Sequence, residues 1–175
     1  MNLIISFSAR ENGNCDQIAK YIATEDDKIV YFRKCNVHPC MNCNYECFQG
    51  ECIYRGDDIY SIYDEMCQYD KVIFLVPMYC GNPSSLYFIF NERCQDYFMH
   101  NDNYEEITKR LYIIGIYGNQ KDTPDFVRCF EKWFECSERD GHVLGIERHP
   151  YNQKIEDSIL DVEEVRMQLL KFVEK

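Results

Sequence analysis

The chain has 175 residues, of which 46% are hydrophobic and 15% aromatic, and its formal net charge is -11. This length suits one packed domain spanning residues 1–175, and the composition excludes a disordered chain. The acidic balance excludes nucleic acid as a partner, because nucleic-acid binding needs a basic surface. No apolar run reaches the roughly eighteen residues that would span a membrane. The N-terminus has no basic stretch ahead of its apolar run, so we expect a cytoplasmic protein without a signal peptide, whose 11 cysteines are reduced.

The chain opens on a strand, a polar loop and a helix, in that order. Leu3–Phe7 is a short apolar run, typical of a strand that is buried on both faces. The loop SARENGNC leads into a predicted helix over residues 16–23. Such a junction points unpaired N–H groups and the positive end of the helix dipole into the loop. Ser8, Arg10 and Asn14 add side-chain donors, so this loop is a candidate phosphate site, with an ordinary capped loop as the alternative.

The second predicted strand, Lys28–Phe32, precedes a cysteine-rich segment over residues 35–57, which we call the thiol loop. Four cysteines there follow the pattern C-x2-C-x3-C-x4-C: Cys40, Cys43, Cys47 and Cys52. Such compact runs are typical of iron–sulfur sites, whose usual ligands are thiolates. A structural zinc site more often uses two separated pairs, so zinc is the less favoured metal, although His38 could act as a ligand. A reduced loop that binds no metal is the third interpretation.

The rest of the chain continues the alternation of strands and helices. The clearest central strand is Lys71–Val76, because five consecutive apolar residues follow its lysine. The loop after it, Pro77–Ser85, is expected where ligands bind in open parallel sheets. The other predicted elements are helices over residues 59–69, 86–94 and 124–141, a surface connection over 100–109, strands over 110–116 and 142–146, and a last helix from about Ile155.

Five strands that alternate with five helices predict an α/β fold with a doubly wound parallel sheet between two helical layers. The expected strand order is the flavodoxin-like 2-1-3-4-5. In this order the loops after the first, third and fourth strands meet at one edge of the sheet. The thiol loop follows the second strand at that same edge, so a ligand there would lie near the thiols.

Three stretches of the sequence resemble the flavodoxin-like NAD(P)H-dependent FMN reductase family, in particular its iron–sulfur flavoprotein branch. SARENGNC is similar to the family's phosphate loop. CMNCNYECFQGEC, followed by DDI, looks like the compact cysteine motif and acidic pair of the branch. VPMYCGNPSS, with Asn91-Glu92-Arg93 after it, is similar to the family's Pro-Val-Tyr loop and the following Asp-Arg pair. The resemblance covers roughly the first 120 residues.

The resemblance implies FMN as the cofactor, NAD(P)H as a co-substrate and a homodimer. The residues that would border FMN are Ser8, Arg10, Asn14 and Cys15 at the phosphate, Pro77, Met78, Tyr79, Cys80 and Gly81 at the ring and ribityl chain, and Tyr117 and Gly118 on the other side of the ring. The same resemblance implies that the four cysteines of the thiol loop hold a 4Fe-4S cluster. Four residues depart from the family pattern: Phe7 stands for a glycine, Cys15 for a threonine, Phe88 for a lysine and Glu92 for an aspartate. The second gap in the cysteine motif is also one residue longer than the iron–sulfur flavoprotein branch usually shows.

The leading hypothesis is therefore an FMN-binding oxidoreductase that exchanges electrons with NAD(P)H, a small molecule or a ferredoxin-like protein. The flavin would carry the chemistry and the protein would orient and tune it, so no side chain is predicted to be catalytic. The alternative hypothesis is a flavodoxin-like binding or interaction module whose thiol loop holds zinc or no metal. That alternative predicts a colourless protein that releases no flavin on denaturation.

Overall fold

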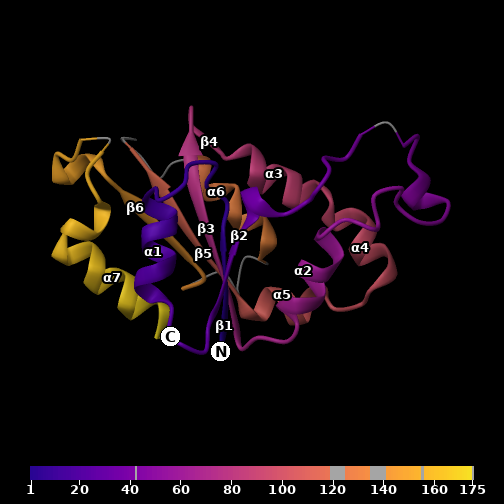
Figure 1. Cartoon of the computed structure of the whole chain (residues 1–175), viewed down its shortest axis with the longest axis horizontal. Coiled ribbons are helices and arrows are strands. Elements are labelled where there is room, and N and C mark those ends of the chain that lie inside the picture. Colours follow the sequence, from indigo (N-terminus) through magenta and orange to yellow (C-terminus); the bar gives the residue numbers. More distant parts are fainter. Residues whose placement is uncertain (42, 119–124, 135–140, 155, 175) are drawn as a thin grey trace.

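The computed structural model describes residues 1–41, 43–118, 125–134, 141–154 and 156–174. Its centre is a parallel sheet in the order β2-β1-β3-β5-β6 (Figure 1). These strands are β1 (Asn2–Ser6), β2 (Lys28–Tyr31), β3 (Lys71–Tyr79), β5 (Leu111–Tyr117) and β6 (Val143–Glu147). The two-residue strand β4 (Asn82–Pro83) pairs antiparallel with the end of β3 and lies off this path. The predicted order 2-1-3-4-5 is therefore confirmed, with β5 and β6 as its fourth and fifth strands.

Helices cover both faces of the sheet and form the outer layers of the predicted sandwich (Figure 1). One face carries α1 (Asn14–Ile22) and α7 (Glu163–Val173). The other face carries α2 (Ile59–Met66), α3 (Ser85–Glu92), α4 (Cys94–His100), α5 (Tyr104–Arg110) and α6 (Asp125–Arg128). Successive residues of a strand pack into the cores on opposite faces of the sheet: Ile5 packs on the α2 and α3 side, whereas Ile4 packs on the α1 and α7 side. This division follows from the alternation of side chains along a strand.

Phe7, which directly follows β1, is the centre of an aromatic cluster on the α3 side of the sheet. Its ring centroid lies 5.1 Å from that of Phe74, 5.2 Å from Phe32 and 5.3 Å from Phe90. The Phe7 ring is fully buried, and tilted or edge-to-face contacts of this kind add to the free energy gained by burial. The Phe7 carbonyl accepts a hydrogen bond of 2.7 Å from the Ser84 hydroxyl. These contacts fix the backbone at the start of the loop that follows β1.

The surface connection predicted over residues 100–109 is wrong in part, because α5 occupies Tyr104–Arg110. Ile107 is fully buried in the core on that face. Acidic residues fill the first turn of this helix and basic residues fill the last turn, which suits the helix dipole. This order of acidic and basic residues in the sequence indicates a helix, even though the stretch is polar.

The two helices predicted near the C-terminus are shorter than expected. In the predicted helix over residues 124–141, α6 ends at Arg128 and a 3-10 turn, Phe130–Trp133, follows it; residues 135–140 lie outside the described part. The aromatic rings there pack around β5, and this tertiary packing overrides the helical spacing. The last helix begins at Glu163 rather than near residue 155, which is itself outside the described part. Ser158 caps a separate 3-10 turn ahead of it, because its hydroxyl accepts a hydrogen bond from the Leu160 N–H.

Across the described residues, each helix falls short of the length and apolar character that a membrane crossing requires.

Gly115 of β5 provides a test of the core packing. A Cβ at this position would lie 2.9 Å from a ring carbon of Phe126 and 2.9 Å from one of Phe130. Gly115→Ala is therefore expected to lower the free energy of unfolding by about 1–3 kcal/mol, measured by urea denaturation. Gly56→Ala is the matched control, because its Cβ meets no described heavy atom within 4 Å. Equal stability of the two variants would contradict the close packing of Phe126 and Phe130 on β5.

Candidate functional site

A cleft of about 660 Å³ lies at the carboxyl edge of the parallel sheet. The described residues that line it are Ser8, Ala9, Arg10, Asn14, Cys15, Pro77, Met78, Tyr79, Ile116, Tyr117, Gly118 and Arg148. They come from the ends of β1, β3, β5 and β6 and from the start of α1. Open parallel sheets bind ligands at this edge, where the connections of neighbouring strands diverge.

The loop between β1 and α1 forms one end of the cleft. Ser8 ties this loop together, because its hydroxyl donates to the Arg10 carbonyl at 3.0 Å and accepts from the Arg10 N–H at 3.2 Å. The Asn14 side-chain oxygen accepts from the Ile159 N–H at 3.0 Å, so the amide NH2 of Asn14 is the group that can donate into the cleft. The first turn of α1 adds backbone N–H groups and the positive end of its dipole. This end of the cleft is suited to an anion.

Cys15 lies at the same end but has a different character. Burial, and then the negative charge of Asp16, raises the pKa of the Cys15 thiol. The side chain is almost fully buried in the core between α1 and α7. Cys15 is therefore a neutral wall of the cleft, and it is not an activated nucleophile.

The middle of the cleft is formed by the end of β3, which is longer than predicted. Pro77, Met78 and Tyr79 belong to this strand and not to a loop. Pro77 is the last β3 residue in register with β5, and the next two residues pair with β4. Tyr79 is 46% exposed, so its ring borders the cleft and also faces solvent.

Cys80 and Gly81, two of the expected ring contacts, directly follow Tyr79. They form the two-residue turn between β3 and β4, with φ angles of 49° and 81°. Two successive positive φ angles are typical of a type I′ hairpin turn, which requires residues that tolerate the left-handed region. The hairpin projects beyond the edge of the sheet (Figure 1), and these two residues are not among the described lining of the cleft.

The far end of the cleft combines Tyr117 and Gly118 with an arginine that sequence reasoning missed. The Arg148 N–H donates to the Tyr117 carbonyl at 3.0 Å, which extends the pairing of β6 with β5. The Arg148 side chain donates through Nη2 to the Lys154 carbonyl, while its Nε is buried without a hydrogen-bond partner among the described residues. Its position just after the fifth predicted strand was the available signal. Burial, and then Glu147, raises the pKa of Tyr117, so its phenol remains a neutral donor.

The thiol loop extends away from the sheet past α2 and α4 (Figure 1). Its attachment depends on Arg93, which lies between α3 and α4 and is 2% exposed. The Arg93 Nη1 donates at 2.7 Å to both the Asp57 carboxylate and the His38 carbonyl. Its Nη2 donates to the Tyr54 carbonyl at 3.2 Å and lies 3.6 Å from the Cys52 sulfur. One guanidinium therefore binds both ends of the loop.

Two acidic side chains reinforce this attachment at the first and last cysteines of the motif. Glu92 accepts a hydrogen bond of 2.7 Å from the Cys40 N–H, and Asp96 accepts one of 3.0 Å from the Cys52 N–H. Glu92, one of the departures noted in the sequence, therefore has a defined structural partner. The loop is thus fixed to the α3–α4 junction by one cation and two carboxylates.

The four thiols share one loop but do not form a metal site in the described structure. Cys40 is exposed, and the other three are partly buried. Burial, and then the neighbouring Cys43 and Glu92, raises the pKa of Cys40; burial, and then Asp96, raises that of Cys47. Among the described residues no three Cys, His, Asp or Glu side chains come together with the geometry of a metal site. The positions of the four thiols in the described structure therefore do not fit an iron–sulfur cluster. That a metal binds in the thiol loop remains a prediction.

Comparison with known proteins reveals similarity in structure but none in sequence. No model of a protein family matches the chain, and no curated protein matches it either. The Trp repressor binding protein from Bacillus subtilis is similar over 99% of this chain and 97% of its own, with 17% identity and a TM-score of 0.61. An FMN-dependent NADH-azoreductase from Bacillus anthracis str. Ames Ancestor, in complex with FMN, covers the same shares with 9% identity and a TM-score of 0.60.

A third similar structure is RosB with bound 8-demethyl-8-formylriboflavin-5′-phosphate. It aligns over 98% of this chain and 74% of its own, with 9% identity and a TM-score of 0.68. At these low identities the likenesses establish the fold, which is the flavodoxin-like α/β sandwich.

The attachment of the thiol loop can be tested at Arg93. Arg93→Met leaves the buried Asp57 carboxylate without its cation, which is expected to lower the free energy of unfolding by about 3–5 kcal/mol in denaturant titrations. Arg128→Met is the control, since its ion pair with Asp125 is exposed and is expected to contribute no more than about 1 kcal/mol. A loss no larger at Arg93 than at Arg128 would contradict a structural role for the buried pair.

Proposed function

We propose that the chain binds FMN in the cleft and acts as an FMN-dependent oxidoreductase that takes electrons from NAD(P)H. The observation that carries this proposal is the joining, in one cleft, of an anion-binding loop at the start of α1 with apolar and aromatic walls at the ends of β3 and β5. Two of the similar proteins support it, because their structures contain FMN or a riboflavin-5′-phosphate derivative.

The residues of the cleft fit the two halves of FMN. The phosphate would be held by Arg10 and the backbone N–H groups at the start of α1, while Ser8, whose hydroxyl already donates to the Arg10 carbonyl, would shape the loop around it. The apolar walls Pro77, Met78 and Ile116 suit a flat ring system, and Tyr117 closes the same side of the cleft. The cleft volume of about 660 Å³ lies in the range of small-molecule and cofactor sites.

The chain's own part in the reaction is to bind, orient and polarise. FMN supplies hydride and electron transfer when it is bound. Arg148 adds a permanent positive charge to the lining of the cleft. Tyr79 presents a half-exposed ring at the rim, beside which a nicotinamide can approach from solvent.

The proposed reaction does not pass through the thiol loop. Its four cysteines are not arranged as a metal site in the described structure, so electron transfer through a cluster is a separate hypothesis. The compact run of cysteines supports the hypothesis that a cluster transfers electrons. Electron donation by a ferredoxin-like protein is part of that same hypothesis.

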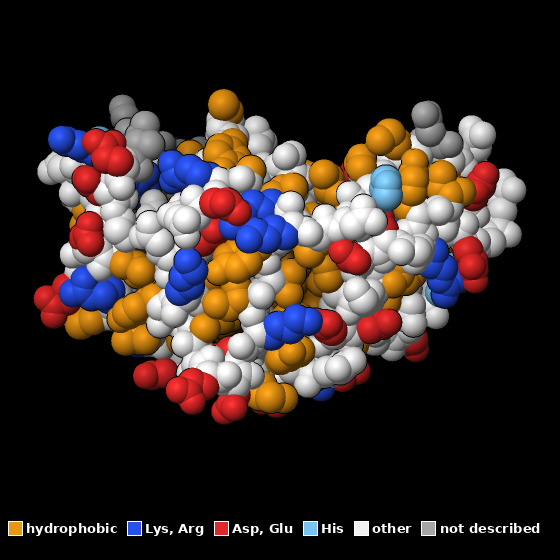
Figure 2. All heavy atoms as spheres, viewed as in Figure 1, with side chains coloured by type: hydrophobic (Ala, Val, Ile, Leu, Met, Phe, Trp, Pro, Cys, Tyr) orange, Lys and Arg blue, Asp and Glu red, His pale blue; other side chains and the backbone are white. Residues whose placement is uncertain are grey.

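A homodimer is also proposed, and the surface of the thiol loop supports it. Tyr45 is 75% exposed and Phe48 is 61% exposed, and Figure 2 shows hydrophobic side chains gathered at the end of the molecule that this loop forms. Exposed apolar groups of this kind are typical of interaction surfaces. Light scattering that returned the mass of one chain would contradict the dimer.

Anaerobic stopped-flow mixing tests the reductase activity directly. Protein reconstituted with FMN is expected to lose its flavin absorbance near roughly 450 nm when mixed with NADH or NADPH, because reduction removes the oxidised flavin band. Dithionite is the control for a reducible flavin. Bleaching by dithionite but by neither nicotinamide would contradict the NAD(P)H-linked reaction and leave a protein carrier as the donor.

Metal analysis tests the separate cluster hypothesis. Protein purified without oxygen is expected to contain iron and acid-labile sulfide if the thiol loop holds a cluster, and zinc alone if it holds that metal. Cys43→Ser is expected to abolish the metal content, whereas Cys129→Ser, outside the loop, is expected to leave it unchanged. Wild-type protein without iron or zinc would contradict both metal assignments.

A further inference from the structure

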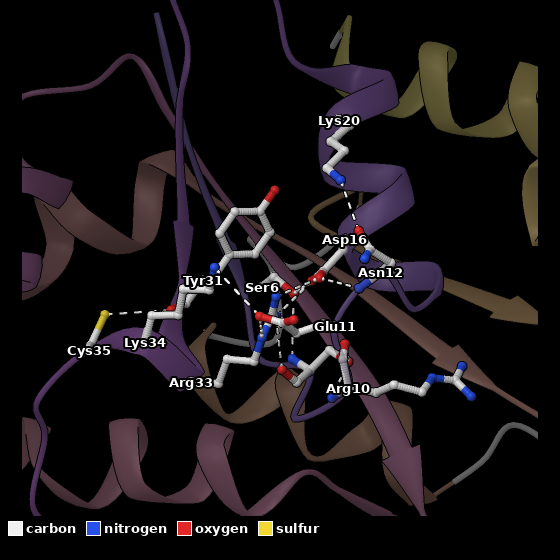
Figure 3. Close-up of polar contacts among 11 residues, drawn as sticks. Ser6, Arg10, Glu11, Asn12, Asp16, Lys20, Tyr31, Arg33, Lys34 and Cys35 are labelled. Atoms are coloured by element: carbon white, nitrogen blue, oxygen red, sulfur yellow. Dashed lines mark hydrogen bonds and ion pairs between the residues drawn. The ribbon is translucent and has the colours of Figure 1, made fainter.

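The loop that begins the cleft is held from behind by a single buried carboxylate, that of Asp16 in the first turn of α1 (Figure 3). Asp16 is 1% exposed and accepts hydrogen bonds from three parts of the chain. The Ser6 hydroxyl donates at 2.8 Å, and the Asn12 N–H donates at 2.9 Å. The Arg33 guanidinium donates twice, at 2.8 and 3.0 Å. The carboxylate therefore joins both ends of the loop to an arginine beyond β2.

Arg33 comes from the 3-10 turn Phe32–Lys34, which follows β2, and it contacts the loop itself. In addition to its two-pronged contact with Asp16, its Nη1 donates to the Ser8 carbonyl at 3.3 Å. Its guanidinium carbon lies 4.8 Å from the centroid of the Tyr31 ring, which supports the side chain from beneath. A planar fork of this kind fixes both the distance and the orientation of its carboxylate partner.

The network also fixes a left-handed backbone position at Asn12. Asn12 has a φ of 53°, in the left-handed region that residues other than glycine seldom adopt. Its N–H bonds to Asp16, its carbonyl accepts from the Gln17 amide, and its side-chain oxygen accepts from Lys20. Figure 3 shows Arg10 extending from the same loop away from this network. The network thus shapes the loop without occupying the side that faces the cleft.

We propose that Arg33, acting through Asp16, is a positioning residue that sets the loop's preference for a flavin bearing a terminal phosphate over riboflavin. The inference rests on the proposed binding of FMN. The Arg10 side chain that would contact a phosphate belongs to the segment whose Ser8 carbonyl and Asn12 N–H the network fixes. When the two hydrogen bonds from Arg33 to Asp16 are lost, that segment is no longer held in one conformation. The groups that would bind the phosphate then no longer point at one anion. The ring contacts at β3 and β5 are unaffected, because none of them bonds to Arg33 or Asp16 in the described structure.

The test compares dissociation constants for FMN and riboflavin by flavin fluorescence quenching. Arg33→Met is expected to raise the dissociation constant for FMN by about tenfold or more, as losses of supporting contacts around binding groups commonly do. The dissociation constant for riboflavin is expected to change by less than about twofold, since riboflavin lacks the group that the loop binds. A general loss of folded protein would weaken both flavins equally, so the ratio of the two constants separates positioning from stability.

Lys34→Met is the matched control. It removes one positive charge from the next residue, whose side chain is 62% exposed, pairs with Glu11 at 3.6 Å and lies 5.6 Å from the centroid of the Tyr31 ring. Its ratio of FMN to riboflavin affinity is expected to equal that of the wild type. If Arg33→Met does not fold, Ser6→Ala removes one hydrogen bond of the same network and is expected to lower the same ratio.

The outcomes distinguish the inference from the proposed function. A wild-type preference for FMN that is reduced in Arg33→Met, or in Ser6→Ala, but not in Lys34→Met supports the inference. A wild-type preference that survives in Arg33→Met, or in Ser6→Ala if that variant must be used, overturns the inference and leaves FMN binding in place. A reduced ratio in Lys34→Met equal to that in the network variant also overturns it, because charge alone would explain the effect. Wild-type protein that binds neither flavin overturns the proposed function together with the inference.

Discussion

Parallel pairing of β1, β3 and β5 brings the carboxyl ends of these strands to one edge of the sheet, and the candidate site depends on that constraint. Each strand end contributes a different surface. The end of β1 leads into the loop with N–H and side-chain donors, β3 contributes an apolar wall, and β5 contributes Tyr117. The cores on the two faces of the sheet fix the spacing of these ends, since Phe7 and its aromatic neighbours pack directly beneath the start of the first loop. A ligand with an anionic end and a flat apolar body suits the resulting arrangement.

Two buried arginine–aspartate pairs attach the irregular segments to this framework. Arg33 with Asp16 holds the loop between β1 and α1, and Arg93 with Asp57 holds the thiol loop against the α3–α4 junction. Both carboxylates are almost fully buried, and each arginine also donates to a backbone carbonyl of the segment that it fixes. Removing one partner of such a pair is costly because the other charge stays buried. In a chain with a formal net charge of -11, these cations serve local structure rather than a general attraction for anions.

Much of the fold could be predicted from the sequence, because the buried strands are continuous apolar runs and their order follows from the alternation with helices. The cleft residues at Ser8, Pro77 and Tyr117 could be found because they directly follow those strands. The pairing of Arg33 with Asp16 leaves no such mark, since the two residues lie on different elements and the contact arises only in the folded chain. The left-handed turn at Cys80 was equally hidden, because a cysteine does not indicate a positive φ. Arg148 was missed although it follows a predicted strand, because its role depends on the extension of β6 along β5.

The central claim is that the cleft holds FMN, and an absorption spectrum of the purified protein tests it most directly. Protein purified without oxygen, or incubated with free FMN and then freed of excess, is expected to show paired bands near roughly 375 and 450 nm that dithionite bleaches. Denaturation is expected to release FMN in proportion to the protein. A featureless spectrum that added FMN cannot restore would contradict the account, and the fold would then be that of a binding module without a flavin.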